Sequence, residues 1–188
     1  MDLLVQGFGS SIPLVGDWSI KNGIAEQNDE DAFYAKLATP LIQEKGVFTY
    51  TFSAKSDARG RGWVGIGLHV FTPKSYTLKG YGSGDSLCVW LTRDPAHLSS
   101  DITRIQLYRS VSDWDMKLLD EVPVEESIYE YHEFQVTVDT AGGTVTISLD
   151  GVQRLSEKGV LDLSRGVFVV LRALDRAEFK EFRVEARE

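Results

Sequence analysis

The sequence predicts an all-β protein that folds as a two-sheet antiparallel β-sandwich of the jelly-roll type. Apolar side chains alternate with polar ones along several segments. This two-residue period is typical of a strand that has one face buried and the other exposed to solvent. Other short runs are apolar on both faces, as expected for strands buried on both sides. Turn signals separate these segments about every ten residues, a spacing typical of sandwiches. Two sheets give each apolar face a partner and limit the exposed edges.

The alternating segments are the clearest. In residues 48–53, aromatic residues occupy every second position, with Thr or Ser between them. Segments 134–138 and 144–149 repeat this pattern with Phe, Val, Ile or Leu. We expect all three to be strands with one face in the core and one face in water.

Two further segments, 87–91 and 167–171, are apolar throughout and are expected in the middle of the sheets. With the remaining runs, roughly eleven or twelve strands are predicted. Short helices fit the pattern only around residues 35–42 and 160–163. No internal repeat or linker interrupts the chain, so residues 1–188 are predicted to form a single domain.

Composition argues against several classes of protein. A chain of 188 residues can bury roughly 70% of its unfolded surface, so one core suffices without disulfides. The 28 acidic residues outnumber the 20 basic ones, which disfavours a nucleic-acid partner because phosphates are held by clustered cations. No apolar run approaches the roughly 20 residues of a membrane helix, so no membrane span is predicted. Cys88, the single cysteine, lies in an apolar segment and offers neither a disulfide nor a metal cluster.

The start of the chain, residues 1–7, lacks the basic residues and the sustained apolar core of a signal peptide. The sequence therefore fits an intracellular protein, or a mature chain whose leader was removed. A secreted or cell-envelope location is favoured if a leader was removed.

One segment stands out for function. Residues 81–95 join a glycine-rich turn to an apolar strand, and the turn delivers Asp85 to the mouth of that strand. Together with segments 18–23, 46–52 and 166–187, this segment resembles, in order, the concanavalin A-like lectin and glucanase domains. In the L-type lectins it runs Gly-Asp-Gly, apolar residues with an aromatic, Thr, a basic residue and an acidic one. The residues that match here are Gly84, Asp85, Ser86, Trp90, Thr92, Arg93 and Asp94. The terminal block also resembles the last strand of laminin-G-like domains.

This resemblance implies a sugar site at Asp85. In the L-type lectins, the acidic residue of the turn accepts hydrogen bonds from sugar hydroxyls, a role that suits an ionised carboxylate. Arg93 would then contact the ligand or an acidic neighbour. The alternative role of Asp85 is to cap the backbone of its own turn.

The same lectins bind calcium through a loop rich in Asp and Asn. Residues 102–109 of this chain offer no oxygen ligands in calcium spacing. We therefore expect no cofactor and no metal, with calcium dependence left open.

Aromatic side chains suit a carbohydrate site because they combine an apolar face with a polar tip. The aromatic candidates for ligand contact are Trp63, Tyr76, Tyr81, Tyr108 and Trp114. Trp114 lies between two Asp residues in an expected loop, which favours exposure. For the others, a place in the core is the alternative.

Segment 63–69 adds a geometric hint. Two glycines leave one face of this expected strand bare between Trp63 and His69, which makes both residues candidate ligand contacts. Glycine within a strand often marks the close approach of a ligand or another backbone. The alternative is that a large neighbour, such as Trp90 or Phe71, fills the gap.

Enzyme interpretations are weaker. Gly84-Asp85-Ser86-Leu87 spells the nucleophile motif of a lipase and esterase family, in which Ser stands on a strand-to-helix turn and an Asp-x-x-His pair lies near the C-terminus. Here Ser86 leads into a strand, and the one Asp-x-x-His follows directly at 94–97, so we interpret the motif as fortuitous. Sandwich glucanases carry Glu-x-Asp-x-x-Glu on one strand, and this sequence holds no such string. No catalytic residue is predicted.

The sequence thus predicts a non-catalytic, lectin-like domain that recognises a glycan or surface polymer through an acidic turn and aromatic residues. The second hypothesis is a structural or assembly domain of a cell envelope or surface polymer, which would bind a protein partner. A glycoside hydrolase is the third.

Overall fold

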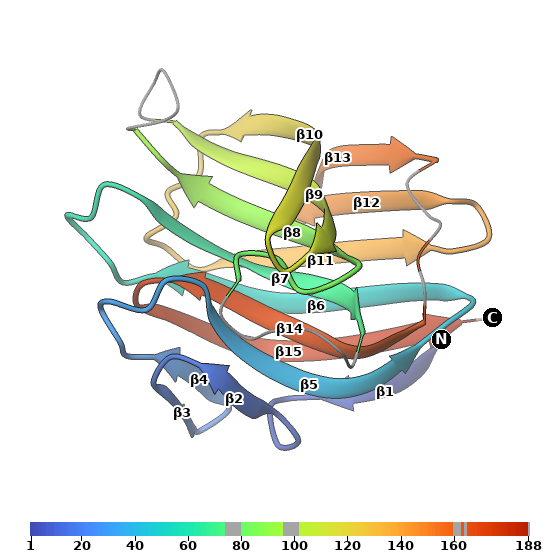
Figure 1. The fold of residues 1–188 in the computed structure, drawn as a ribbon, viewed down its shortest axis with the longest axis horizontal. Coiled ribbons are helices and arrows are strands. Elements are labelled where there is room, and N and C mark those ends of the chain that lie inside the picture. Colours follow the sequence, from blue (N-terminus) through green and yellow to red (C-terminus); the bar gives the residue numbers. More distant parts are fainter. Residues whose placement is uncertain (74–79, 96–101, 160–162, 164, 188) are drawn as a thin grey trace.

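The computed structural model describes residues 1–73, 80–95, 102–159, 163 and 165–187. These residues form a sandwich of antiparallel strands, which confirms the predicted all-β jelly roll (Figure 1). Within them, no helix is long and apolar enough to cross a membrane. The strands are β1 (Asp2–Gln6), β2 (Ile12–Val15), β3 (Trp18–Lys21), β4 (Ile24–Gln27), β5 (Ala35–Gln43), β6 (Val47–Ser56), β7 (Val64–Thr72), β8 (Ser86–Arg93), β9 (Thr103–Ser112), β10 (Asp115–Val124), β11 (His132–Asp139), β12 (Thr144–Leu149), β13 (Val152–Lys158), β14 (Gly166–Leu174) and β15 (Ala177–Arg187).

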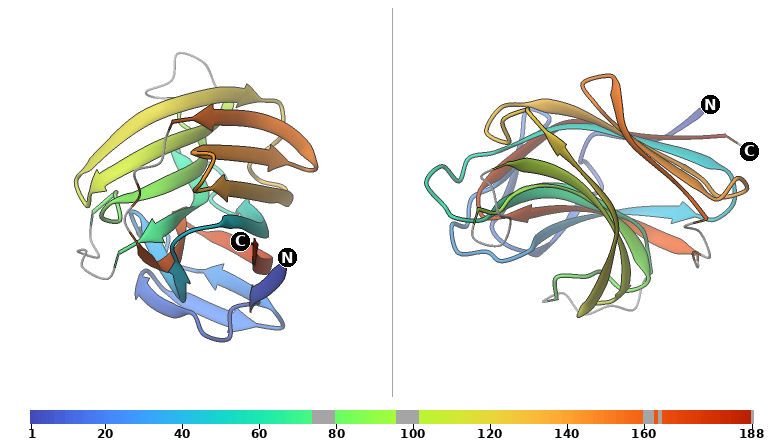
Figure 2. Two further views of the ribbon diagram at one scale, coloured as in Figure 1. Left: turned by 90° about the vertical axis from the view of Figure 1, so that its right-hand side faces the viewer. Right: turned by 90° about the horizontal axis from the view of Figure 1, so that it is seen from above.

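The strands form two sheets that face each other (Figures 1 and 2). The eight-stranded sheet has the order β13-β12-β11-β6-β15-β4-β3, and β1 pairs with β15. The seven-stranded sheet has the order β10-β9-β8-β7-β14-β5-β2. Because β1 and β15 are paired, the two ends of the chain lie close together (Figure 1).

The core between the sheets is built around aromatic rings. Phe52 on β6 lies opposite Phe134 on β11, and their rings stack with centroids 4.7 Å apart. Phe8 and Phe182 form a second stack at 5.6 Å. The apolar alternation seen in the sequence therefore marks the residues that hold the two sheets together.

Two local expectations are wrong. The short helix expected at 35–42 is a strand, β5, because hydrogen bonding to β14 on one side and β2 on the other fixes an extended backbone. Residues 160–162 of the second expected helix lie outside the described residues. The wet face expected for residues 48–53 is buried, because β6 lies between β11 and β15 in the middle of its sheet. The wet faces of 134–138 and 144–149 are confirmed.

The outer face of the seven-stranded sheet turns away from the core. On β8, Leu87, Val89 and Leu91 enter the core, so Trp90 and Thr92 point outward. One register row crosses this face: Lys36 on β5, Arg172 on β14, Gly67 on β7, Trp90 on β8, Gln106 on β9 and Glu121 on β10. The far end of the β9–β10 hairpin projects beyond this face (Figure 2).

A buried lysine ties the loop before β8 to the same face. Lys36 Nζ donates to the carbonyl oxygens of Gly80 at 2.9 Å and Gly82 at 2.6 Å. Ser83 is held from the hairpin side, since its backbone N–H donates to Ser110 Oγ at 3.0 Å. Residues 80–83 are therefore held in place against the sheet.

Candidate binding site

A pocket of about 300 Å³ opens on the outer face of the seven-stranded sheet. Half of its lining residues are aromatic, and most of the others are polar or charged. It is lined by Tyr34, Trp63, Tyr81, Trp90, Thr92, Asp94, Gln106, Tyr108, Met116 and Arg172. This set of residues is called the outer pocket below.

Gly65 and Gly67 lie on β7, next to Trp90 of the outer pocket. A Cβ atom at Gly65 would lie 2.0 Å from Cζ2 of Trp90, so the indole ring occupies the space that a side chain would take. A Cβ atom at Gly67 would lie 2.0 Å from the carbonyl oxygen of Val89 on the neighbouring strand. The alternative in which Trp90 fills the gap is therefore confirmed at Gly65, whereas at Gly67 the neighbouring backbone takes the space.

Arg172 forms the floor beside Trp90. Its Cζ lies 4.3 Å from the centroid of the Trp90 ring and 4.7 Å from that of Tyr34. Only 4% of the residue is exposed, and its Nε has no hydrogen-bond partner. Nη1 contacts His69 Nε2 at 3.4 Å, and its other contacts are the sulfur atoms of Cys88 at 3.5 Å and Met116 at 3.7 Å.

Polar groups of the pocket are held in two separate sets of hydrogen bonds. Trp63 Nε1 donates to Thr92 Oγ1 at 3.0 Å, which fixes the indole ring at the pocket mouth. Tyr108 donates to Gln106 Oε1 at 3.1 Å, and Gln106 Nε2 donates to Glu121 Oε2 at 2.9 Å. These donors and acceptors are pre-oriented by the protein.

Two phenols of the pocket, those of Tyr34 and Tyr108, stay protonated near neutral pH. Burial raises the pKa of Tyr108 to about 12. Burial also raises the pKa of Tyr34, although the Arg172 guanidinium opposes this shift. Tyr34 can therefore donate a hydrogen bond to a ligand, whereas Tyr108 already donates its proton to Gln106.

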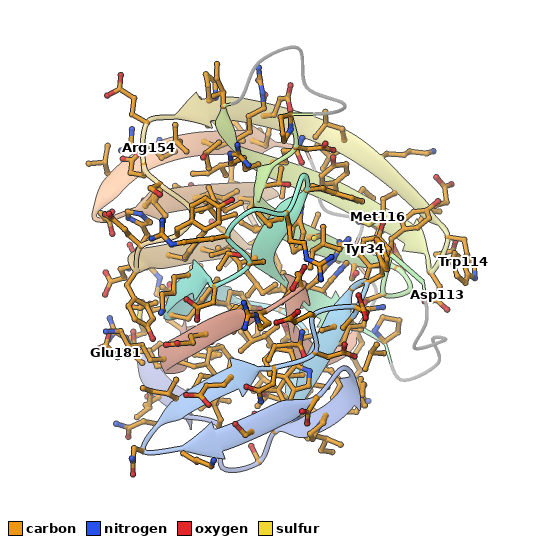
Figure 3. All side chains as sticks on the ribbon, turned by 90° about the vertical axis from the view of Figure 1, so that its left-hand side faces the viewer. Tyr34, Asp113, Trp114, Met116, Arg154 and Glu181 are labelled. Atoms are coloured by element: carbon orange, nitrogen blue, oxygen red, sulfur yellow. The ribbon has the colours of Figure 1, made fainter. Side chains whose placement is uncertain are left out.

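The rim is a run of aromatic rings. Tyr81 lies 6.0 Å from Tyr34 and 6.0 Å from Trp114, measured between ring centroids, and its hydroxyl donates to the Trp114 carbonyl oxygen. Trp114 is 60% exposed. Tyr34 and Met116 lie on the pocket side of the molecule, with Asp113 and Trp114 farther out on the hairpin (Figure 3).

The residues predicted from the sequence lie in different parts of the structure. Trp63, Tyr81 and Tyr108 line the outer pocket, and Trp114 stands next to Tyr81 on its rim. His69 lies below the floor, fully buried against Arg172, and its Nδ1 lies 3.2 Å from Ser86 Oγ. Burial, reinforced by the nearby cations, holds the pKa of His69 well below its usual value, so its ring is neutral.

Asp85 and Arg93 lie elsewhere. Asp85 forms an ion pair with Arg109 on β9, and Gly84 of the same turn donates its N–H to Asp113 Oδ1 at 3.0 Å. Arg93 lies 3.4 Å from the Tyr129 hydroxyl and lines a separate cavity of about 640 Å³. Their roles as ligand contacts stay predictions, and Tyr76 lies outside the described residues.

Sequence reasoning missed Arg172, Tyr34, Gln106 and Met116. A signal for Arg172 was present, because it is the one charged residue in the otherwise apolar strand β14. Tyr34 has a φ of 57°, a positive value that non-glycine residues rarely adopt. Sequence alone gives no indication of that conformation.

The Gly-Asp-Ser-Leu motif does not have the geometry of a hydrolase triad. Ser86 and His69 are hydrogen-bonded, but both are fully buried. The second ring nitrogen of His69 faces the Arg172 guanidinium, where a triad would place a carboxylate. Among the described residues, no group of three or more His, Cys, Asp or Glu side chains is arranged to hold a metal ion.

None of the family models or curated proteins compared with this sequence matches it. Several solved structures match over nearly the whole chain. The carbohydrate binding module CBM66 from Bacillus subtilis aligns with a TM-score of 0.67 and 14% identity, over 94% of this chain and 95% of that one. The metal-free Emp46p carbohydrate recognition domain aligns with a TM-score of 0.70 and 11% identity, over 94% and 88%.

A third structure, the legume lectin-like domain from Entamoeba histolytica, aligns with a TM-score of 0.68 and 7% identity, over 98% of this chain and 96% of that one. The fold is that of the concanavalin A-like jelly rolls. The resemblance predicted from the sequence is thus confirmed for the fold. At these identities the likeness concerns the fold alone.

Proposed function

We propose that this protein is a carbohydrate-binding, lectin-like domain and that the outer pocket is its binding site. The observation that carries the proposal is the aromatic pocket itself, in which Trp63, Trp90 and Tyr81 surround a small set of oriented polar groups. The names of its structural neighbours, a carbohydrate binding module, a carbohydrate recognition domain and a lectin-like domain, support it.

The chemistry of the pocket suits a sugar ring. The C–H face of a sugar can lie against the Trp63 indole, whose position is fixed by Thr92 before the ligand arrives. Asp94 lines the same pocket and accepts hydrogen bonds from hydroxyl groups strongly because it is an anion. A volume of about 300 Å³ is at the lower end of ligand sites, so we expect one sugar residue to enter.

The acidic turn remains a second proposed contact. Asp85 is half-buried and engaged with Arg109, so a sugar hydroxyl there would have to share the carboxylate with that ion pair. Asp85→Asn removes the charge and keeps the shape, while Trp63→Ala acts on the outer pocket. The two variants therefore separate the two proposed sites.

We also propose that the domain is non-catalytic. The buried Ser86–His69 pair, which faces a cation, supports this. The alternative, an assembly domain with a protein partner, draws support from another surface, where a cavity of about 700 Å³ lies beside the exposed residue Leu3 and against Ile24 and Phe182.

A glycan-array screen of the wild-type protein, with and without calcium, tests the proposal. We expect specific hits that Trp63→Ala abolishes. Tyr131→Ala is the matched control, because it removes an aromatic ring that lies between Lys55 and Lys180 on the other sheet. A blank array, or hits that Trp63→Ala leaves intact, would contradict the assignment of the outer pocket.

A further inference from the structure

Arg172 is a buried cation for which the described part of the chain provides no carboxylate partner. It lies on β14, 4% exposed, with Lys36 directly opposite it on β5. Buried charges in proteins are normally paired, and like charges opposite each other on neighbouring strands destabilise a sheet. If Arg172 had only a structural role, placing it unpaired and opposite another cation would gain the fold nothing.

The contacts of Arg172 leave its hydrogen-bonding capacity largely unused. The rings of Trp90 and Tyr34 contact the guanidinium at 4.3 and 4.7 Å and supply no acceptor in its plane. Its N–H groups meet one ring nitrogen and two sulfur atoms, which are weak acceptors, and Nε has no hydrogen-bond partner. A guanidinium offers five N–H groups in a fork that matches two oxygens of an anion.

Two cations lie side by side at the floor of the pocket. Lys36 is held next to Arg172 by two carbonyl oxygens. Glu121 on β10 is engaged with Gln106 and Arg104, and Asp113, in the turn before β10, accepts a hydrogen bond from the N–H of Gly84. Asp94 lies on the wall of the pocket. A positive floor in a chain with a net charge of −8 singles out this site for an anion.

We propose that the ligand of the outer pocket is an acidic sugar, whose carboxylate or phosphate binds the Arg172 guanidinium. This inference rests on the proposed function and adds the ligand class. Arg172 takes the anionic group in a forked pair of hydrogen bonds, and Asp94, on the wall of the same pocket, takes the hydroxyl groups. One sugar residue with one anionic substituent can therefore contact both Arg172 and Asp94.

The test is calorimetric titration of the full chain with sodium glucuronate, glucose 6-phosphate and glucose. The first two probes separate a carboxylate from a phosphate, and glucose is the neutral reference. We expect at least one acidic probe to bind ten-fold or more tightly than glucose, and its affinity to fall as salt is raised. Arg172→Gln should remove this preference, whereas Arg165→Gln, at an exposed arginine paired with Glu44, should not.

A second measurement does not depend on the variant folding. In the wild-type protein, the NMR signal of the Arg172 Nε–H group should shift on titration with the preferred acidic probe. Binding of glucose as tightly as both acidic probes would overturn the inference and leave the proposed function standing. Acidic binding that does not move this signal would also overturn it. Absence of binding by every probe and by the glycan array would contradict both.

Discussion

Single residues determine the shape of the outer pocket. Gly65 provides the space in which Trp90 lies, and Trp90 in turn supports Arg172. Neither the contact of Gly65 with Trp90 nor that of Trp90 with Arg172 can be predicted from the sequence, because each joins residues on different strands. A local sequence feature, a glycine in a strand, therefore has its effect through a neighbour on another strand.

Gly65→Ala should destabilise the protein and disturb the pocket. The new Cβ would lie 2.0 Å from the Trp90 ring, so the indole must move, which we expect to lower the free energy of unfolding by about 1–3 kcal/mol. Urea unfolding and tryptophan fluorescence measure the two effects. Gly62→Ala is the matched control, since an added Cβ there meets nothing within 4 Å. Equal stability of the two variants would contradict the account.

Lys36 predicts a pH dependence of stability. Burial, together with the Arg172 charge, lowers the pKa of Lys36 from 10.5 to about 8 in the folded protein. Between these two pH values the unfolded chain binds more protons than the folded one, so this group makes stability rise with pH. The rise amounts to at most about 3 kcal/mol.

The comparison that isolates this effect is wild type against Lys36→Met. The difference in free energy of unfolding between them, wild type minus variant, should increase from pH 8 to pH 10.5. Lys117→Met, at an exposed position, controls for general effects of losing a lysine. A difference that stays constant over this range would show that Lys36 titrates as an ordinary lysine.

Sequence reasoning found the aromatic residues of the outer pocket better than its charged ones. Trp63 and Tyr81 were predicted and line the outer pocket. Arg172 was not, because its role depends on the rings of Trp90 and Tyr34, which come from other parts of the chain. Asp85 was favoured because its motif is local, and the ion pair with Arg109 depends on the pairing of β8 with β9.

At the scale of elements, the periodicity of the sequence predicts where strands lie, but it does not predict which strands pair with each other in a sheet. The alternation in 134–138 predicts β11 and its buried face. The expected helix at 35–42 failed because both neighbours of β5 come from distant parts of the chain. Burial of both faces of β6 likewise reflects its central place in the sheet.

The pairing of β6 with β11 gives an element-scale prediction. Phe134→Ala removes one ring of the stack with Phe52 and should lower the free energy of unfolding by about 3–5 kcal/mol. Gln135→Ala, on the exposed face of the same strand, should change it by less than about 0.5 kcal/mol. Urea unfolding of both variants decides the matter, and a similar loss in the two would contradict the assigned faces.

At the scale of the whole molecule, the sequence predicted a concanavalin A-like sandwich, and the structural neighbours confirm that fold. The fold does not fix the site, because sandwiches present several faces and loops on which a ligand can bind. The outer pocket is assigned from its own geometry, with Trp63 at the mouth and Arg172 in the floor.

The four tryptophans allow the most direct test of this assignment. Trp63 and Trp90 line the outer pocket and Trp114 stands on its rim, whereas Trp18 lies on β3 of the other sheet, with its Nε1 bonded to the Val15 carbonyl at 2.7 Å. The indole N–H signals should be followed by NMR while the best glycan from the array is added. We predict that the signals of Trp63 and Trp90 shift while that of Trp18 stays in place. Saturable binding that leaves both pocket signals unchanged would contradict the account and move the site elsewhere.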